Sequence, residues 1–229
     1  MLRPLADGLW VADAPMRVLP FMDIGTRMTV VRTTDGGVVL HSPVEASAAV
    51  RDAVAKVGPV RAVICPNKVH HLYAGPWKEA HPGARLLGPP GLARKRRDLA
   101  FDGELGDVAD PSFAGALECH LVKGIPLMNE VAFYHPASRT LLVTDLAFHP
   151  TPTSSRGLRF WCLLTRTGAF GPNQVVRFTI RDRAALGASL DRILAWDFDR
   201  VTVTHGEVLE SGGKELFRRG WKRKQKGGV

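Results

Sequence analysis

Three histidines and one aspartate stand at the ends of apolar segments that lie far apart in the sequence. They are His70, His71, Asp145 and His205. Neutral imidazole together with carboxylate suits Zn²⁺, Fe²⁺ or Mn²⁺, and four such ligands complete a tetrahedral shell or leave room for water at five coordination. We therefore expect these residues to form a site for one divalent metal ion, with zinc as the first candidate and iron or manganese as alternatives.

The same residues are also compatible with ordinary structural roles. His70 could cap a helix, Asp145 could accept backbone N–H bonds, and His205 could occupy a turn before Gly206. Their spacing alone does not separate these roles from metal binding.

The segments that lead to these residues have the pattern of buried strands. They are rich in valine, leucine, isoleucine and threonine, and they comprise residues 60–65, 141–144 and 201–204. A strand at 38–41, a helix at 44–57 that starts at Ser42-Pro43, and the strand at 60–65 have the spacing of a crossover unit. Because functional sites of layered α/β folds assemble at strand ends, we expect the four side chains to converge.

The rest of the chain alternates between strand and helix patterns. Further strands are predicted at 8–12, 27–32, 85–88, 117–122 and 130–135, and helices at 72–80, 160–164, 181–196 and 214–221. No linker divides the chain, so we predict one domain over residues 1–217 followed by a basic tail at 218–229.

Composition narrows the class of protein. The 229 residues are 45% hydrophobic and 23% charged, which is typical of a folded domain. Six of the formal +9 charges fall in residues 218–229, so the rest of the chain carries little excess charge, and we regard nucleic acid as an improbable partner. No segment approaches the roughly 18 to 20 apolar residues of a membrane span, and the first residues lack the pattern of a signal peptide. We expect a cytoplasmic protein with no membrane partner.

Three motifs together resemble the metallo-β-lactamase superfamily. They are Val-Ile-Cys-Pro-Asn-Lys-Val-His-His-Leu-Tyr-Ala-Gly at 63–75, Leu-Leu-Val-Thr-Asp at 141–145 and Val-Thr-Val-Thr-His-Gly at 201–206. The resemblance covers nearly the whole chain and is strongest to an uncharacterised branch, a domain of unknown function with a Pro-Asn-x-x-His-His motif. It implies an α+β fold, a four-layered αββα sandwich with a metal site at one edge of the paired sheets.

The resemblance also implies that half of the family's two-metal site is lost. The family's His-x-His-x-Asp-His motif falls on residues 66–71, where Pro66 and Lys68 replace its first two histidines. His70 then occupies the place of the motif's aspartate and His71 the place of its last histidine. Asp145 corresponds to the bridging aspartate and His205 to the final histidine, so one metal site remains.

Hydrolysis is the reaction class that such a site would serve. A single bound Zn²⁺ lowers the pKa of a bound water to roughly 7 and so supplies hydroxide at neutral pH. We therefore predict a mononuclear metal-dependent hydrolase acting on a small molecule. A scaffold that binds a ligand without catalysis, and a nucleic-acid-processing relative, are the alternatives.

Other side chains near the predicted site are candidates for supporting roles. Lys68 is a weak catalytic candidate, as a cation near a developing oxyanion or as a solvated loop lysine. His41, Asn67 and Glu207 could orient ligands, although each also has an ordinary alternative: a strand-end histidine, a turn residue and a surface glutamate. Arg156, Arg159 and Trp161 follow in a segment that could roof the pocket and favour an anionic substrate.

Overall fold

The protein, in a computed structural model that describes residues 1–20 and 22–222, is built on two large β-sheets. The first sheet has seven strands in the order β1-β2-β5-β6-β7-β8-β9. Their bounds are Leu2–Ala6 (β1), Leu9–Ala14 (β2), Thr26–Arg32 (β5), Val38–His41 (β6), Val60–Ile64 (β7), Arg85–Gly88 (β8) and Gly103–Glu104 (β9). The pairs from β1 to β6 are antiparallel, and those from β6 to β9 are parallel.

The second sheet has four strands in the order β10-β11-β12-β13. They are Glu118–Leu121 (β10), Val131–His135 (β11), Thr140–Leu142 (β12) and Arg200–Thr202 (β13). The β12–β13 pair is parallel, so both strands end at the same edge. A small hairpin, Arg17–Leu19 (β3) with Met22–Asp23 (β4), lies outside both sheets.

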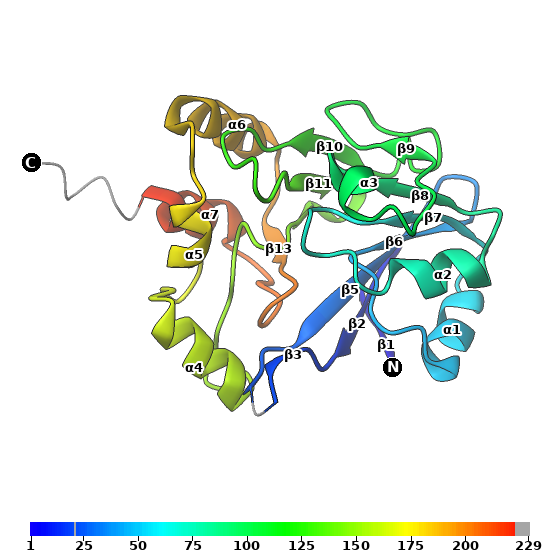
Figure 1. The fold of residues 1–229 in the computed structure, drawn as a ribbon, viewed down its shortest axis with the longest axis horizontal. Helices are drawn as coiled ribbons and strands as arrows, with labels where there is room; N and C mark the ends of the chain where they lie inside the picture. Colours follow the sequence, from blue (N-terminus) through cyan, green and yellow to red (C-terminus); the bar gives the residue numbers. More distant parts are fainter. Residues whose placement is uncertain (21, 223–229) are drawn as a thin grey trace, which may run out of the picture.

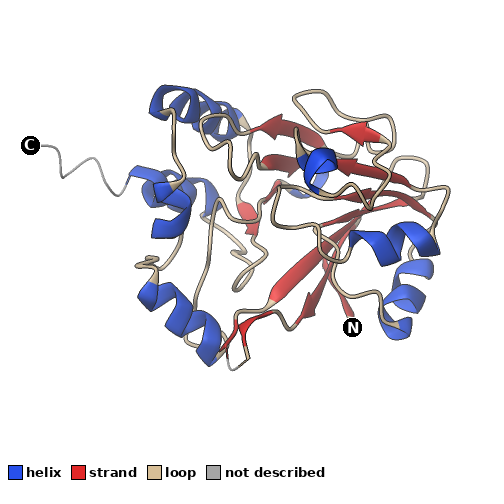
Figure 2. Ribbon diagram, in the orientation of Figure 1, coloured by secondary structure: helices blue, strands red, loops and turns tan. Residues whose placement is uncertain are grey.

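Helices cover the outer faces of the two sheets (Figures 1 and 2). Ala48–Ala55 (α1) and Ala74–Ala80 (α2) lie on one side of the molecule. The other side carries Arg156–Leu164 (α4), Gln174–Phe178 (α5), Arg183–Ala195 (α6) and Gly213–Lys222 (α7). Leu92–Lys95 (α3) and a 3₁₀ turn at Pro136–Ser138 (η1) are short connections.

Alternation of side chains along the strands produces four layers. On β11, Val131 and Phe133 pack into the core between the sheets, whereas Ala132 and Tyr134 face the helices α6 and α7. On β8, Leu87 faces the inter-sheet core and Leu86 faces the α1–α2 side. The structure thus confirms the predicted four-layered αββα sandwich, with a core on each face of each sheet.

The start of the first crossover differs from the sequence prediction. The helix begins at Ala48 with Ser47 at its N-cap, not at Ser42-Pro43. Ser42 instead adopts a left-handed conformation, with φ at 54°, and its hydroxyl turns toward His70. A Ser-Pro pair suits a helix start, but an N-cap residue has an extended backbone, which the left-handed Ser42 does not have.

The C-terminal helix extends into the region predicted as a tail. α7 runs to Lys222, and both Arg218 and Arg219 form ion pairs with Glu215. The remainder of the predicted tail, 223–229, lies outside the described residues. No helix among the described residues is long and apolar enough to cross a membrane.

Candidate metal centre

His70, Asp145 and His205 meet at one point between the two sheets. Each offers a ligand atom, and these atoms all lie within 4.8 Å of one another. All three side chains are buried. His70 follows β7 of the first sheet, and Asp145 and His205 follow the parallel strands β12 and β13 of the second. Strands that end at facing edges therefore bring together residues separated by up to 135 positions.

The histidine rings are fixed so that one nitrogen of each faces the shared point. His205 donates from Nδ1 to the carbonyl oxygen of Gly25 at 2.7 Å, which leaves Nε2 with a free lone pair. Its ring stacks on Phe148 with centroids 5.1 Å apart. His70 uses Nδ1 to contact the Ser42 hydroxyl at 3.1 Å, and its Nε2 lies 3.3 Å from Asp145 Oδ2.

Asn67 orients both Asp145 and His70. Its Nδ2 donates to Asp145 Oδ2 at 2.7 Å and to Thr144 Oγ1 at 2.8 Å. Its Oδ1 accepts from the backbone N–H groups of Val69 and His70, each at 2.7 Å. The side chain therefore holds its own turn, as its residue type suggests, and also fixes one carboxylate oxygen of Asp145.

Glu130 holds the backbone at Asp145, a role that the sequence did not predict. Its Oε1 accepts from the backbone N–H of Thr144 at 2.6 Å, and its Oε2 accepts from that of Asp145 at 2.9 Å. Asn67 Nδ2 also reaches Glu130 Oε2, at 3.2 Å. The only signal in the sequence is a glutamate at the start of an apolar strand, which carries no information about its partners on the next strand.

Burial and the neighbouring charges shift the pKa of each group at the centre. Burial and the neighbouring Asp145 raise the pKa of Glu130 to about 7. Burial, reinforced by His70, lowers the pKa of His205 to about 4. Burial also opposes the charged forms of His70 and Asp145, but their mutual attraction prevails, so the pKa of His70 is raised and that of Asp145 is lowered.

The turn that carries His205 is held by Arg27 and requires Gly206. The buried guanidinium of Arg27 donates through Nη1 to the carbonyl oxygens of Val203, at 2.9 Å, and Gly206, at 2.7 Å. Gly206 has φ at +109°, and a Cβ there would lie 2.2 Å from the carbonyl oxygen of His149. Strand β5 thus fixes the position of a turn some 180 residues later in the chain.

His71, the fourth predicted ligand, lies outside this group. Its Nδ1 is 2.8 Å from Nη1 of Arg96, which donates to it, and the same Nη1 donates to the His71 carbonyl oxygen at 3.2 Å. Burial, followed by the charges of Lys95 and Arg96, lowers the pKa of His71 to about 4. The structure therefore unites three of the four predicted ligands and gives His71 a cationic partner instead.

Two of the candidates for orienting ligands make no such contact. His41 packs edge-on against Phe133, and its buried Nε2 has no hydrogen-bond partner among the described residues. Within residues 1–20 and 22–222, Glu207 meets an imidazole only through its backbone oxygen, which lies 2.8 Å from Nδ1 of His149. Ser42, which contacts His70, and Glu130, which holds the backbone of Asp145, take the ligand-orienting roles predicted for His41 and Glu207.

A cavity of about 400 Å³ opens beside the centre. Asp145, His205, Lys68 and Trp161 are among the residues that line it. Arg156 and Arg159, predicted to roof the pocket together with Trp161, line a separate hollow on α4 instead. Trp161 follows Arg159 by two residues on α4, roughly half a turn around the helix, so its indole faces away from the Arg159 guanidinium.

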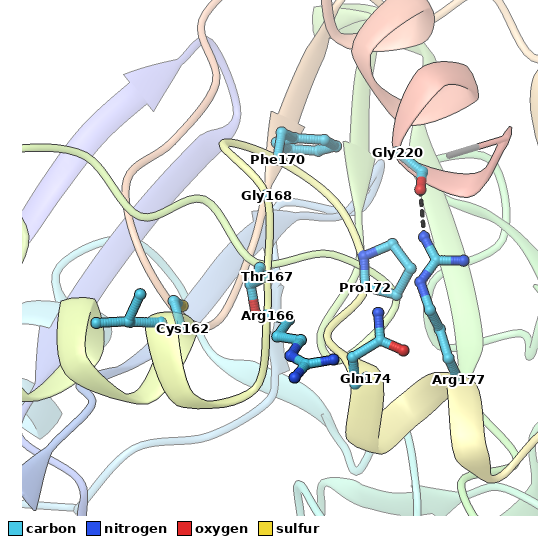
Figure 3. A pocket seen from close by; sticks show the side chains of 10 residues that line it. Cys162, Arg166, Thr167, Gly168, Phe170, Pro172, Gln174, Arg177 and Gly220 are labelled. Carbon is cyan, nitrogen blue, oxygen red and sulfur yellow. Dashed lines mark hydrogen bonds between the residues drawn. The ribbon is translucent and has the colours of Figure 1, made fainter. Parts of the chain in front are cut away.

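A second hollow of about 390 Å³ lies among α4, α5 and α7, away from the three candidate ligands (Figure 3). Arg166 and Arg177 point toward it, and Arg177 donates to the carbonyl oxygen of Gly220. None of the residues that line it belongs to the His-Asp-His group.

The His-Asp-His group fits a divalent transition-metal ion. Two imidazoles and one carboxylate match the donor types that zinc, iron and manganese accept. The buried Nε2 of His70 makes no well-aligned hydrogen bond among residues 1–20 and 22–222, and the polar atom it faces is Asp145 Oδ2 at 3.3 Å. A divalent ion that displaced the proton on this nitrogen would satisfy both the imidazole and the carboxylate.

Comparisons with known proteins bear on the fold. The sequence matches no protein-family model and no curated protein. Among solved structures, a metallo-beta-lactamase from Hirschia baltica is 15% identical, with 96% of this chain and 95% of that chain covered and a TM-score of 0.66. The mono-zinc form of the metallo-beta-lactamase FIM-1 from Pseudomonas aeruginosa is 11% identical, with 97% and 93% covered and a TM-score of 0.67.

A third match is the metal-soaked Flv1 flavodiiron core from Synechocystis sp. PCC6803, which is 13% identical. It covers 97% of this chain and 60% of that chain, with a TM-score of 0.67. Sequence identities this low support a conclusion about the fold alone. Together with the two paired sheets and their outer helices, they show that this chain has the metallo-beta-lactamase fold.

Proposed function

We propose that this protein is a hydrolase of small molecules that uses one divalent metal ion held by His70, Asp145 and His205. The observation that carries the proposal is the convergence of three buried ligand atoms within 4.8 Å. Three protein ligands leave a coordination position open, which is typical of catalytic rather than structural sites. Zinc is the first candidate for the ion, with iron and manganese next.

A bound ion would supply a water that is deprotonated near neutral pH. The chain's own residues supply the rest of the arrangement. Asn67 and Glu130 hold Asp145 in one orientation, the Gly25 carbonyl fixes the tautomer and direction of His205, and the Ser42 hydroxyl holds the direction of the His70 ring. This pre-organisation supports the proposal, because metal sites depend on the groups that orient their ligands.

A single ion is favoured over two. Positions 66 and 68, where the resemblance would require histidines, carry Pro66 and Lys68. Lys68 lines the cavity beside Asp145, and its Nζ donates to the carbonyl oxygen of Pro126 at 2.9 Å. We propose that its charge stabilises a developing oxyanion in place of the missing ion. Membership of the Pro-Asn-x-x-His-His branch stays a prediction.

A binding protein without catalytic activity is the second candidate. Two features favour it: Arg96 engages His71, and a backbone carbonyl engages Lys68. Both contacts hold potentially reactive groups in structural roles.

Elemental analysis separates the two candidates. The protein is purified without added metal, then reconstituted with Zn²⁺, Fe²⁺ or Mn²⁺ and desalted before analysis. We expect about one ion per chain, lost in His205→Ala and Asp145→Asn but retained in the adjacent control His71→Ala. A wild-type protein that stays empty after reconstitution would refute the metal-dependent hydrolase and favour the binding protein.

A further inference from the structure

The cavity beside the candidate metal centre has a mainly apolar wall that reaches the surface. Among the residues lining it, Val18, Val69, Leu127 and Val175 remain between 38% and 66% exposed. Large apolar side chains grouped around one opening are uncommon on a soluble surface unless something covers them. A cavity of about 400 Å³ with such a wall has the size and character of a small-molecule pocket.

Two lysines add positive charge to this wall. Lys68 Nζ donates to the Pro126 carbonyl oxygen at 2.9 Å, and Lys95 Nζ donates to the Lys68 carbonyl oxygen at 2.6 Å. Neither ammonium forms an ion pair with a carboxylate in the described part of the chain. Arg96, the neighbour of Lys95, is by contrast paired with Asp98 at 2.6 Å.

Asp145, the one acidic residue among the described residues that line the cavity, is already engaged. Asp145 lies 3.3 Å from His70 Nε2 and accepts from Asn67. The indole N–H of Trp161, also in the wall, is buried without a partner among the described residues. Within the described chain, the cavity therefore combines an apolar wall with two cations without a carboxylate partner and one free N–H donor. These polar groups are complementary to an anion, whereas the free lone pair of His205 Nε2 belongs to the candidate metal centre.

We propose that this cavity binds an amphiphilic anion, an apolar body that carries one carboxylate or phosphate group. The anionic group contacts Lys68 and Lys95, and the apolar body covers Val69, Leu127 and Val175. That this ligand is the substrate rests on the proposed hydrolase function. Binding itself depends only on residues of the chain and needs no metal ion.

Matched probes test the proposal on the full-length, chelator-treated protein, so that a probe carboxylate has no metal ion to bind. Isothermal titration calorimetry compares octanoate and octyl phosphate with octanol, which lacks the charge, and with acetate, which lacks the apolar body. We expect the better of the two anionic probes to bind about tenfold more tightly than octanol, and acetate to show no binding. The ranking of octanoate and octyl phosphate identifies which anionic group is preferred.

Two variants separate the contributions. Lys68→Met combined with Lys95→Met should remove the advantage over octanol but leave octanol binding intact, whereas Val175→Asp should weaken all the octyl probes. Lys56→Met, an exposed lysine at the end of α1, is the matched control and should change nothing.

Equal binding of octanol and both anionic probes to the wild type would overturn the proposal, as would an unchanged anion preference in the double variant. Metal content is measured separately on the same preparations. Octanoate binding to a protein that takes up no metal would refute the proposed hydrolase function and leave the proposed anion pocket standing. Normal metal uptake without binding of either anionic probe would refute the anion pocket and leave the hydrolase proposal standing.

Discussion

Replacing Asn67 with alanine should weaken both the fold and the metal centre. The side chain is fully buried, and its two ends connect Asp145, Thr144 and Glu130 to the backbone of Val69 and His70. Asn67→Ala removes all of these bonds and leaves buried donors and acceptors without partners.

The expected magnitudes follow from those contacts. A lost hydrogen bond to a charged group costs about 1.5 to 3 kcal/mol, so with partial relaxation we expect a loss of about 3 kcal/mol in the free energy of unfolding. Loss of a group that orients a metal ligand typically reduces metal affinity by about 10- to 100-fold. We therefore expect zinc affinity to fall by at least about tenfold.

Asn173→Ala is the matched control, because Asn173 is also buried and also accepts from a backbone N–H, that of Val176 at the start of α5. Losing this cap should cost about 1 kcal/mol and leave metal affinity unchanged. Denaturant titration of metal-free protein gives the stability, and competition with a chromophoric chelator gives the affinity. Wild-type zinc affinity in Asn67→Ala would refute the role of Asn67 in orienting Asp145.

Three further predictions concern the turn at His205 and the buried His41. Gly206→Ala should destabilise the protein by roughly 2 to 4 kcal/mol and weaken metal binding, because its Cβ would overlap the His149 carbonyl oxygen; thermal denaturation beside Gly212→Ala, where nothing lies within 4 Å, checks this. Arg27→Met should release the same turn and lower zinc affinity, and the reasoning fails if the chelator competition shows no change. Burial, followed by the nearby His70, lowers the pKa of His41 to about 3, so below pH 6.5 protons bind the unfolded chain and stability is lost as pH falls. The free energy of unfolding of His41→Phe should therefore rise relative to that of the wild type by up to about 1.4 kcal/mol for each pH unit that the pH falls between 6.5 and 3. Parallel curves of stability against pH for the two proteins would contradict the lowered pKa of His41.

Much of the architecture was predictable because it depends on local patterns. Apolar strands such as 60–65 and 130–135 alternate between two cores, and the crossover through α1 forces β6 and β7 to be parallel. The parallel neighbours β12 and β13 of one sheet then bring Asp145 and His205 together, and the end of β7 in the facing sheet adds His70. β1 and α5 were not predicted, since Pro4 interrupts the strand pattern of one and the other is only five residues long.

The contacts around the ligands could not be predicted, because they join residues distant in sequence. Glu130 reaches the backbone of Asp145 across neighbouring strands, and Ser42 meets His70 because the strands that precede them, β6 and β7, pair in parallel. His71 directly follows a candidate ligand, yet its ring accepts a hydrogen bond from Arg96, 25 positions later in the chain. Spacing identifies which residue types are present near a strand end, but tertiary packing decides which of them face the centre.

Anomalous X-ray scattering at the zinc absorption edge, from crystals of reconstituted protein, tests the central claim most directly. Our account predicts one peak per chain, about 2.0 to 2.2 Å from a ring nitrogen of His70, a ring nitrogen of His205 and an oxygen of Asp145, with His71 still on Arg96. A peak coordinated elsewhere, or no peak in crystals soaked with excess zinc, would contradict it.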